Sequence, residues 1–169
     1  MRPTPADPAA WQAHLAEGNA RQARKRVVAD VLLRDVAGHV LLVNPTYKPG
    51  WDLPGGMAEA NEPPEEAATR ELREELGLSL TLCGLLVVDW VAPHGPWDDQ
   101  IAFVFDGGTM DVRAAEMSLC DGELSEAAFV SQEAARGLLT DRLRNRFDAA
   151  MTSLRAGRAA YLHDGNPTW

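Results

Sequence analysis

Three glutamates within five positions, Glu71, Glu74 and Glu75, are the side chains of this sequence best placed to do chemistry together. In a helix that turns by about 100° per residue, the three carboxylates fall on one narrow face. The neighbouring arc of the same helix is apolar and carries Leu72 and Leu76. The carboxylates therefore lie at the edge of the stripe that we expect to be buried.

This placement breaks two rules of helix electrostatics. Like charges one turn apart repel each other by about 0.2–0.5 kcal/mol. The glutamates also stand just before Gly77, the expected end of the helix, where the helix dipole disfavours anions. A bound hard cation would remove both penalties, and Mg²⁺ takes oxygen ligands from one or two carboxylates and from substrate phosphates. A solvated, charged helix face explains the same residues until the wider pattern is considered.

That wider pattern is a fixed spacing around the glutamates. Gly56 is followed by five residues, then Glu62, then seven residues, and then the segment RELREELGL at 70–78. The spacing matches the Nudix box at every specified position, and the stretch WDLPGG at 51–56 leads into it. The chain therefore resembles a Nudix hydrolase over residues 56–78.

The resemblance implies a reaction and a set of metal ligands. Nudix hydrolases cleave a diphosphate linkage in a nucleoside diphosphate derivative, such as a dNTP, an NTP or ADP-ribose, with water and Mg²⁺ or Mn²⁺. Carried over, Glu71, Glu74 and Glu75 are the metal ligands, and the carbonyl of Gly55 or Gly56 adds another. The general base is Glu74 or Glu71, or a glutamate from a later loop.

Other residues of the box are structural in the family. The resemblance implies that Glu62 and Arg70 form an ion pair that braces the loop against the helix. Gly56 and Gly77 belong to the same structural group, because glycine permits close backbone approach and a left-handed helix end.

Residues outside the box could bind the rest of the substrate. The substrate-binding candidates are Tyr47 and Trp51, which could stack on a base, and Asp99, which could supply an extra ligand or base from a loop facing the helix. Each of these side chains could equally serve in packing or as solvated loop charge. The further candidates are Trp90 and Trp97 for stacking, and Asp98, Glu116, Glu123 and Glu126 for an additional ligand or base.

The periodicity of the chain indicates strands interleaved with helices, which predicts an α/β fold, the Nudix-type α/β/α sandwich with a mixed sheet. We expect an N-terminal extension with a helix over 1–25, a Nudix hydrolase domain over 26–157 and a C-terminal tail over 158–169. The expected strands are 26–33, 39–43, 51–53, 80–92, 100–106 and 127–130, and the expected helices are 9–24, 64–76, 131–138 and 141–156.

Composition narrows the classes of partner. The 169 residues carry a net charge of −9, which argues against electrostatic binding to nucleic acid or to an anionic membrane. Cys83 and Cys120 stand apart, with no zinc-type spacing. The N-terminus shows no apolar signal region, so we expect a cytoplasmic protein that acts on a small molecule. The family resemblance makes a homodimer possible.

Two alternative functions remain beside the hydrolase. A non-catalytic Nudix-fold nucleotide sensor or binding module would usually show a damaged glutamate segment, whereas the segment here is intact. A Nudix-like isomerase acting on isoprenyl diphosphates would use a cysteine, and neither cysteine has a recognisable context.

Overall fold

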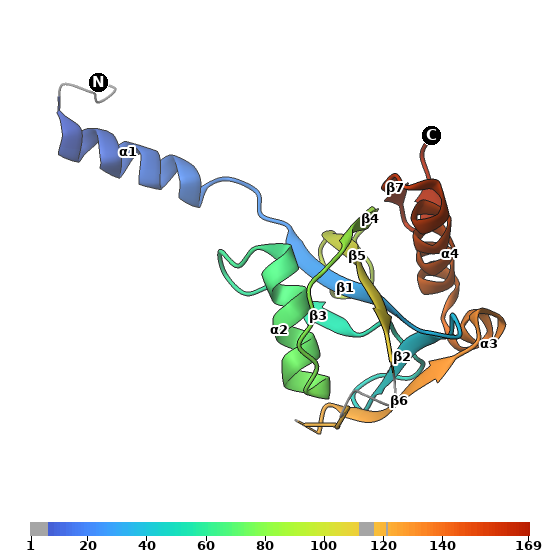
Figure 1. Ribbon diagram of the computed structural model, residues 1–169. Helices are drawn as coiled ribbons and strands as arrows, with labels where there is room; N and C mark the ends of the chain where they lie inside the picture. The colour runs from blue at the N-terminus through green and yellow to red at the C-terminus, as the bar shows by residue number, and fades with distance from the viewer. Residues whose placement is uncertain (1–6, 112–116, 121) are drawn as a thin grey trace.

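The chain forms a mixed β-sheet between two layers of helix in a computed structural model that describes residues 7–111, 117–120 and 122–169 (Figure 1). The helices are α1 (Pro8–Ala20), α2 (Pro64–Leu76), α3 (Gln132–Leu138) and α4 (Asp141–Ala156). The strands are β1 (Arg26–Asp35), β2 (Val40–Pro45), β3 (Gly55–Met57), β4 (Gly84–Val91), β5 (Gln100–Met110), β6 (Leu124–Val130), β7 (Ala160–His163) and β8 (Asn166–Pro167). The expected α/β/α sandwich is confirmed.

Strand β1 is the centre of the sheet. Within the described residues the order is β6-β2-β1-β5-β4-β7-β8, and β1 runs parallel to β5. The other edge of β1 is divided between two antiparallel partners, because β3 pairs with residues 28–30 and β2 pairs at Arg34. This division lays Gly55 and Gly56 directly alongside Asp30 and Ala29.

The side chains of β1 alternate between two hydrophobic cores. Ala29 and Val31 belong to a cluster that includes Leu72 of α2. Leu32 belongs to the opposite cluster, with Phe147 of α4. Because successive strand residues face opposite sides of a sheet, one strand supports both helix layers.

Helix α2 has the bounds that its sequence predicts. Pro63 is extended at φ −62° and ψ 140°, and Pro64 opens the first turn. Gly77 ends the helix in the left-handed region at φ 67°, and its N–H bonds to the carbonyl of Arg73 at 3.0 Å. The Pro-Pro start and the glycine stop thus confirm the predicted helix over 64–76.

Two segments differ from the sequence-based expectation. Residues 51–53 form only isolated bridges, Trp51 to Leu139 and Asp52 to Val43, and the nearby strand is β3 instead. The segment 158–169, expected as a tail, contributes β7 and β8 to the sheet. Strand β7 pairs in parallel with β4, a partner so distant in sequence that no local pattern indicates the pairing.

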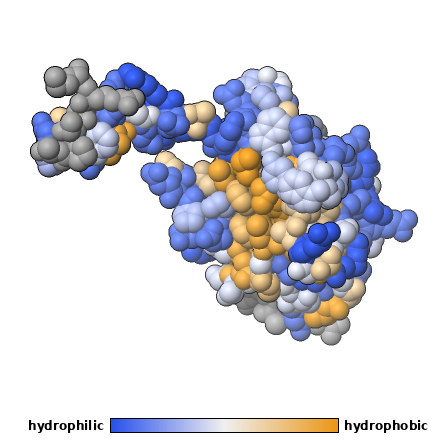
Figure 2. Space-filling view, turned by 90° about the horizontal axis from the view of Figure 1, so that it is seen from above, coloured by the Kyte–Doolittle hydropathy of each residue, from blue (hydrophilic) through white to orange (hydrophobic). Residues whose placement is uncertain are grey.

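Helix α1 lies apart from the sandwich and has no buried residue. Figure 1 shows it projecting from the body on an extended segment that leads into β1. Figure 2 shows this projection as largely hydrophilic, whereas hydrophobic surface gathers in a band over the body. No helix in the described residues is long and apolar enough to cross a membrane.

A buried ion pair fastens α4 to the sheet. The Nε of Arg146 donates to Asp89 Oδ2 on β4 at 3.0 Å, and the two residues are 3% and 0% exposed. Asp89 Oδ1 also accepts the backbone N–H of Gly165 at 3.1 Å. The pair therefore connects α4, β4 and the chain beyond β7.

We expect Asp89→Ala to lower the free energy of unfolding by about 3–5 kcal/mol, because it leaves the buried guanidinium of Arg146 without its closest partner. Urea denaturation measures the loss. Asp148→Ala is the matched control, since Asp148 pairs with Arg136 at 2.7 Å on the surface and should cost no more than about 1 kcal/mol. Equal losses in the two variants would contradict the role given to the buried pair.

Candidate active site

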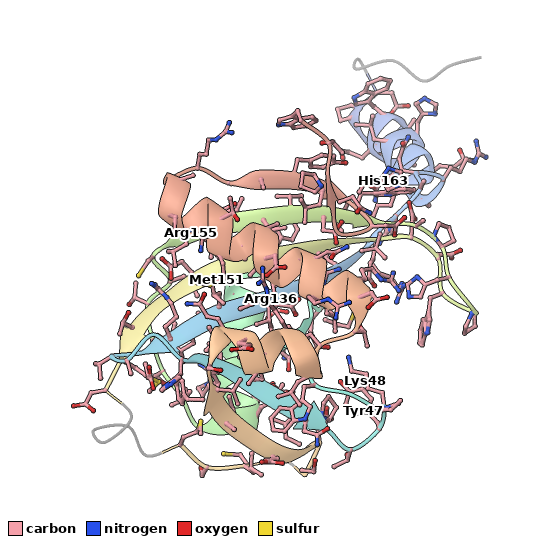
Figure 3. All side chains as sticks on the ribbon, turned by 90° about the vertical axis from the view of Figure 1, so that its right-hand side faces the viewer. Tyr47, Lys48, Arg136, Met151, Arg155 and His163 are labelled. Carbon is pink, nitrogen blue, oxygen red and sulfur yellow. The ribbon has the colours of Figure 1, made fainter. Side chains whose placement is uncertain are left out.

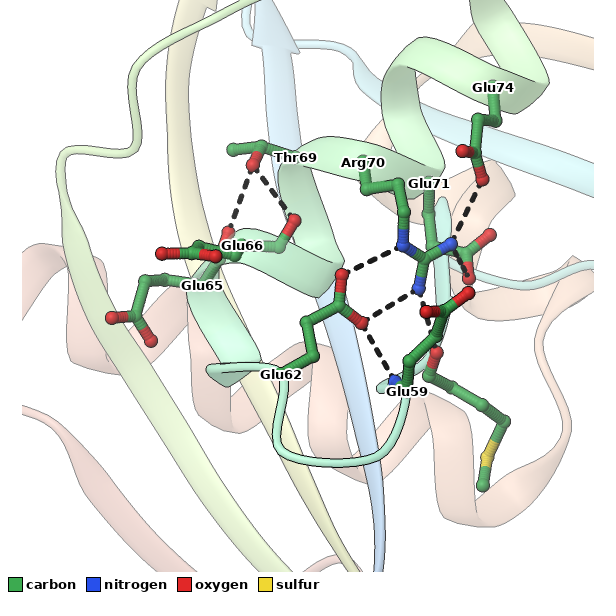
Figure 4. A network of polar contacts seen from close by, with 9 residues as sticks. Glu59, Glu62, Glu65, Glu66, Thr69, Arg70, Glu71 and Glu74 are labelled. Atoms are coloured by element: carbon green, nitrogen blue, oxygen red, sulfur yellow. Dashed lines mark hydrogen bonds and ion pairs between the residues drawn. The ribbon is translucent and has the colours of Figure 1, made fainter.

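The guanidinium of Arg70 connects the carboxylates of the box (Figure 4). Its Nε and Nη2 donate to the two oxygens of Glu62 at 2.8 and 3.0 Å. Its Nη1 donates to Glu71 Oε1 at 3.0 Å and to Glu74 Oε2 at 2.9 Å. Nη2 also donates to the carbonyl of Met57 at 3.0 Å. One cation thus joins β3 and the following loop to the glutamate face of α2, and the expected ion pair with Glu62 is present.

The carboxyl groups around Arg70 have different pKa values. Hydrogen bonds from Arg70, and then from the backbone N–H of Glu59, lower the pKa of Glu62 to about 2. Glu71 behaves in the opposite way, because burial raises its pKa, and the charge of Glu74 adds to the rise while Arg70 opposes it. The effect of burial on Glu71 therefore outweighs that of its ion pair with Arg70.

The contact between Gly56 and Glu71 requires a glycine. A Cβ added at Gly56 would lie 2.6 Å from Cδ and Oε1 of Glu71. Gly55 adopts φ +141°, and a Cβ there would lie 2.2 Å from the carbonyl oxygen of Ala29. The absence of side chains at both positions lets the backbone of β3 approach a carboxylate on one side and β1 on the other.

The three glutamates of α2 differ in burial. The side chain of Glu74 is 51% exposed and that of Glu71 is 18% exposed, whereas Glu75 is 4% exposed. Glu75 lies within electrostatic range of Tyr47, whose pKa is raised by burial and, in addition, by the charges of Glu75 and Glu123. The carboxylate face thus extends from the Arg70 network toward the loop that carries Tyr47.

The carboxylates of the α2 glutamates do not converge on one point in this structure. Within residues 7–111, 117–120 and 122–169, no three His, Cys, Asp or Glu side chains form a group that could hold a metal ion. Glu71 and Glu74 both point toward Arg70 Nη1 and bond to it, and so they do not surround a space that a metal ion could occupy. The donors still suit a hard cation, because they are all carboxylate oxygens and the Glu71 carboxylate lies against the backbone of Gly56.

A cavity of about 500 Å³ adjoins this site. Gly55 and Gly56 line it, and so do the substrate candidates Tyr47 and Trp51. Figure 3 shows Tyr47 on a loop at the same end of the sandwich as the start of α4. A second cavity of about 430 Å³, between α4 and the C-terminal strands, contains none of the box residues.

The third substrate candidate, Asp99, does not line this cavity. Its Oδ2 accepts the Nε1–H of Trp90 at 2.9 Å and pairs with Lys25. Both contacts lower the pKa of Asp99, and the hydrogen bond from Lys25 has the larger effect. Asp99 therefore joins the segment before β1 to β4, and Trp90 also lies outside the lining.

The remaining loop candidates are dispersed. Trp97 lines the cavity under the guanidinium of Arg26, 4.9 Å from its ring centre. Glu123 is close enough to Glu71 to help raise its pKa. Asp98 and Glu126 are exposed, and Glu116 lies outside the described residues.

Sequence reasoning missed several charged residues of the cavity. Asp30 and Asp52 line it, as do Lys48, Arg142 and Arg146. Two signals could have been used, since Asp30 interrupts the apolar run RVVADVLL and Arg146 directly precedes the buried Phe147 of α4. A charge inside a buried pattern requires a partner or a function. Burial, followed by the nearby charge of Asp52, raises the pKa of Asp30 to about 7.

Comparison with known proteins gives one family. The family model described as NUDIX domain matches residues 24–151. An 8-oxo-dGTP diphosphatase of Proteus vulgaris is 56% identical over 55 residues, which are 32% of this chain and 46% of that protein. An ADP-ribose pyrophosphatase of Mycobacterium tuberculosis (strain ATCC 25618 / H37Rv) is 33% identical over 96 residues, which are 56% of this chain and 46% of that protein. The chain spans about half the length of these curated relatives.

A solved structure confirms the fold. The MutT protein from Methanosarcina mazei Go1 superposes with a TM-score of 0.64 at 27% sequence identity. The match covers 80% of this chain and 99% of that one. The arrangement of sheet and helices described above is therefore the Nudix fold.

We expect Gly56→Ala to weaken Mg²⁺ binding roughly 10- to 100-fold, because the new methyl group displaces a carboxylate that the site would use as a ligand. Calorimetric titration with Mg²⁺ measures the change. Gly84→Ala is the matched control, since nothing lies within 4 Å of a Cβ added at the start of β4. Unchanged Mg²⁺ affinity in Gly56→Ala would show that the Gly56 contact does not shape a metal site.

The pKa of Glu62 predicts a pH-dependent effect of Glu62→Gln. Because the folded-state pKa is depressed to about 2, the ionised group stabilises the fold above its unfolded pKa near 4.5. This contribution is lost as the pH falls from about 4.5 toward 2. Urea titrations should therefore show the variant less stable than wild type at pH 6, with the difference shrinking by pH 3. A difference that stays constant over this range would contradict the assignment.

Proposed function

The chain belongs to the Nudix family, and from this premise we propose that it hydrolyses a diphosphate linkage in a nucleoside diphosphate derivative, with Mg²⁺ or in its place Mn²⁺. One observation carries the proposal. The carboxylate of Glu71 packs against Gly56, and Gly56 in turn lines a cavity large enough for a nucleotide. The names of the relatives, a diphosphatase and a pyrophosphatase, support the same class of reaction.

The metal would be held by Glu71, Glu74, Glu75 and the carbonyl of Gly55. Bound there, Mg²⁺ would neutralise the charge of the diphosphate and lower the pKa of a bound water molecule. For this set to assemble, Glu74 has to leave Arg70, and its half-exposed side chain is free enough of packing to do so. Arg70 would keep its two hydrogen bonds to Glu62 and so would hold the loop in place.

The proton of the attacking water needs a carboxylate acceptor. Glu74 or Glu71 would serve as this general base, and both are catalytic candidates on α2. Glu123, at the edge of β6, is the alternative from a later loop, since it interacts electrostatically with Glu71. Replacing each residue by glutamine removes the acceptor and nearly preserves the shape, so the base is the residue whose glutamine variant loses kcat while its Mg²⁺ affinity stays unchanged.

The cavity would bind the nucleoside part of the substrate. Tyr47 and Trp51 offer aromatic surface, and Asp99 would act from outside by fixing Lys25 and Trp90. We expect a small-molecule nucleotide in the cytoplasm, and the net charge of −9 opposes contact with nucleic acid or an anionic membrane. A homodimer would be compatible with this site.

Turnover of a nucleotide panel tests the proposal. With Mg²⁺ or Mn²⁺, wild type should release phosphate or nucleotide from at least one of a dNTP, an NTP, ADP-ribose, a dinucleoside polyphosphate and a nucleotide sugar. Glu74→Gln and Glu75→Gln should lower kcat by about 10²–10⁴-fold, because each removes a ligand or the base. Glu65→Gln, an exposed glutamate in the first turn of α2, should leave kcat unchanged.

Binding of nucleotide and Mg²⁺ without turnover of any compound would make the chain a binding module and would refute the hydrolase. An equal effect of Glu65→Gln and Glu74→Gln would show that the assigned face of α2 is not the site.

A further inference from the structure

The inner wall of the cavity beside Gly56 contains two charged side chains that are almost wholly buried. Asp30 of β1 is 4% exposed and Arg146 of α4 is 3% exposed, and both line the cavity. They lie on the α4 side of the sheet, since Asp30 and Leu32 face the same way along β1. The glutamates of α2 lie on the opposite side, so this pair is separate from the proposed metal site.

The hydrogen bonds of the pair are incomplete. Arg146 makes its close bond to Asp89 at 3.0 Å, and reaches Asp30 only through Nη1 to Oδ2 at 3.4 Å. Among the described residues, Arg146 Nη2 has no acceptor, and Asp30 has no second side-chain or backbone donor to its carboxylate. An N–H donor of Arg146 and an acceptor oxygen of Asp30 therefore lie side by side at the cavity wall without a protein partner in the described part of the chain.

A purely structural clamp does not need this arrangement. Asp89 already pairs with Arg146, lies outside the cavity lining and accepts a further bond from Gly165. Asp30 adds a second buried carboxylate near Asp52, a like charge that lines the same cavity. A buried carboxylate with one long contact destabilises the fold unless a ligand supplies donors.

We propose that Asp30 and Arg146 read the base of the nucleotide and select a guanine-type edge, in which N–H donors stand next to a carbonyl. This inference rests on the proposed function in one respect, namely that the ligand is a nucleoside derivative. Asp30 accepts the ring and amino N–H groups, and Arg146 Nη2 donates to the adjacent carbonyl oxygen. Both side chains are specificity-determining, and neither takes part in bond cleavage.

The hydrogen-bonding groups of guanine and adenine explain why the pair would select guanine. The guanine edge offers two N–H donors to a carboxylate and a carbonyl acceptor to a guanidinium. The adenine edge offers a single amino group and a ring nitrogen, which leaves one carboxylate oxygen without a donor. A site built to hydrogen-bond a ligand rejects the analogue that leaves its buried groups unpaired. Trp51 in the same cavity adds stacking surface that does not distinguish bases.

One ligand could reach both sites. Gly55 is the register partner of Asp30 across β1 and β3, and both residues line the cavity. The cavity of about 500 Å³ therefore extends from Asp30 to Gly55 and Gly56, and the backbone of Gly56 meets the Glu71 carboxylate on its other side, beyond the cavity lining. This continuity gives the pair access to the nucleoside end of the molecule whose diphosphate is cleaved.

The test compares guanine with adenine in two independent readouts. The first is kcat/KM with Mg²⁺ for nucleotide pairs that differ only in the base, such as dGTP with dATP. The second is equilibrium binding of GMP and AMP in EDTA, which needs neither metal nor turnover. Wild type should prefer guanine at least tenfold in binding, and also in kcat/KM where turnover occurs.

Asp30→Asn should lower the guanine values roughly 10- to 100-fold. The adenine values should stay constant or rise, because an amide can both donate to and accept from adenine. Arg146→Lys, which keeps the charge but loses the planar fork, should also reduce the preference. Asp106→Asn is the matched control, since it breaks an Asp–Arg pair with Arg34 at 2.8 Å outside the cavity lining, and it should leave the preference unchanged.

The outcomes separate the inference from the proposed function. Equal binding of GMP and AMP by wild type overturns the base-reading pair, whether or not nucleotides are hydrolysed. Equal losses for both bases in Asp30→Asn and Arg146→Lys also overturn it, because a structural clamp predicts that result. Tighter binding of GMP without any turnover supports the pair and overturns only the hydrolase.

Discussion

The site depends on the hydrogen bonds that Arg70 makes to four different residues. Its guanidinium bonds Glu62, Glu71 and Glu74 and the carbonyl of Met57, so one side chain positions a loop, a strand and a helix. The carboxylates would otherwise repel one another across a single helical turn. Arginine suits this position because its planar fork can bond two carboxylate oxygens and still present a further N–H. The folded chain thus holds its glutamates with an internal cation.

Strand β1 connects the Arg70 site to the cavity on the opposite side of the sheet. Its edge pairs with β3 at residues 28–30, which fixes Gly55 and Gly56 beside the strand whose other side chains build both cores. The close approach works only because neither glycine carries a Cβ. A displacement of β3 would therefore move the Glu71 contact and the cavity wall together. In the proposed complex, this one strand pair would align the two ends of the nucleotide.

The sequence predicts the local features of this site and misses the non-local ones. Pro63, Pro64 and Gly77 define α2, and the fixed spacing from Gly56 to Leu78 identifies the family, because both signals lie within one short segment. The contact of Asp30 with Arg146 joins residues 116 positions apart, and no local pattern contains it. Strands β3 and β7 are short and exist through their partners β1 and β4, so their own residues carry little strand signal.

The distribution of charge connects metal binding with nucleotide binding. The chain has 25 acidic and 16 basic residues, yet the cavity lining has four basic side chains, Arg26, Lys48, Arg142 and Arg146, against the two carboxylates of Asp30 and Asp52. The lining is thus more basic than the chain as a whole, even though Lys48 pairs with Asp52 and Arg146 with Asp89, whereas the neighbouring face of α2 is acidic. In the proposed complex, a diphosphate beside the α2 glutamates would need a bound cation to offset their charge. By linkage, metal and nucleotide should then each raise the affinity for the other.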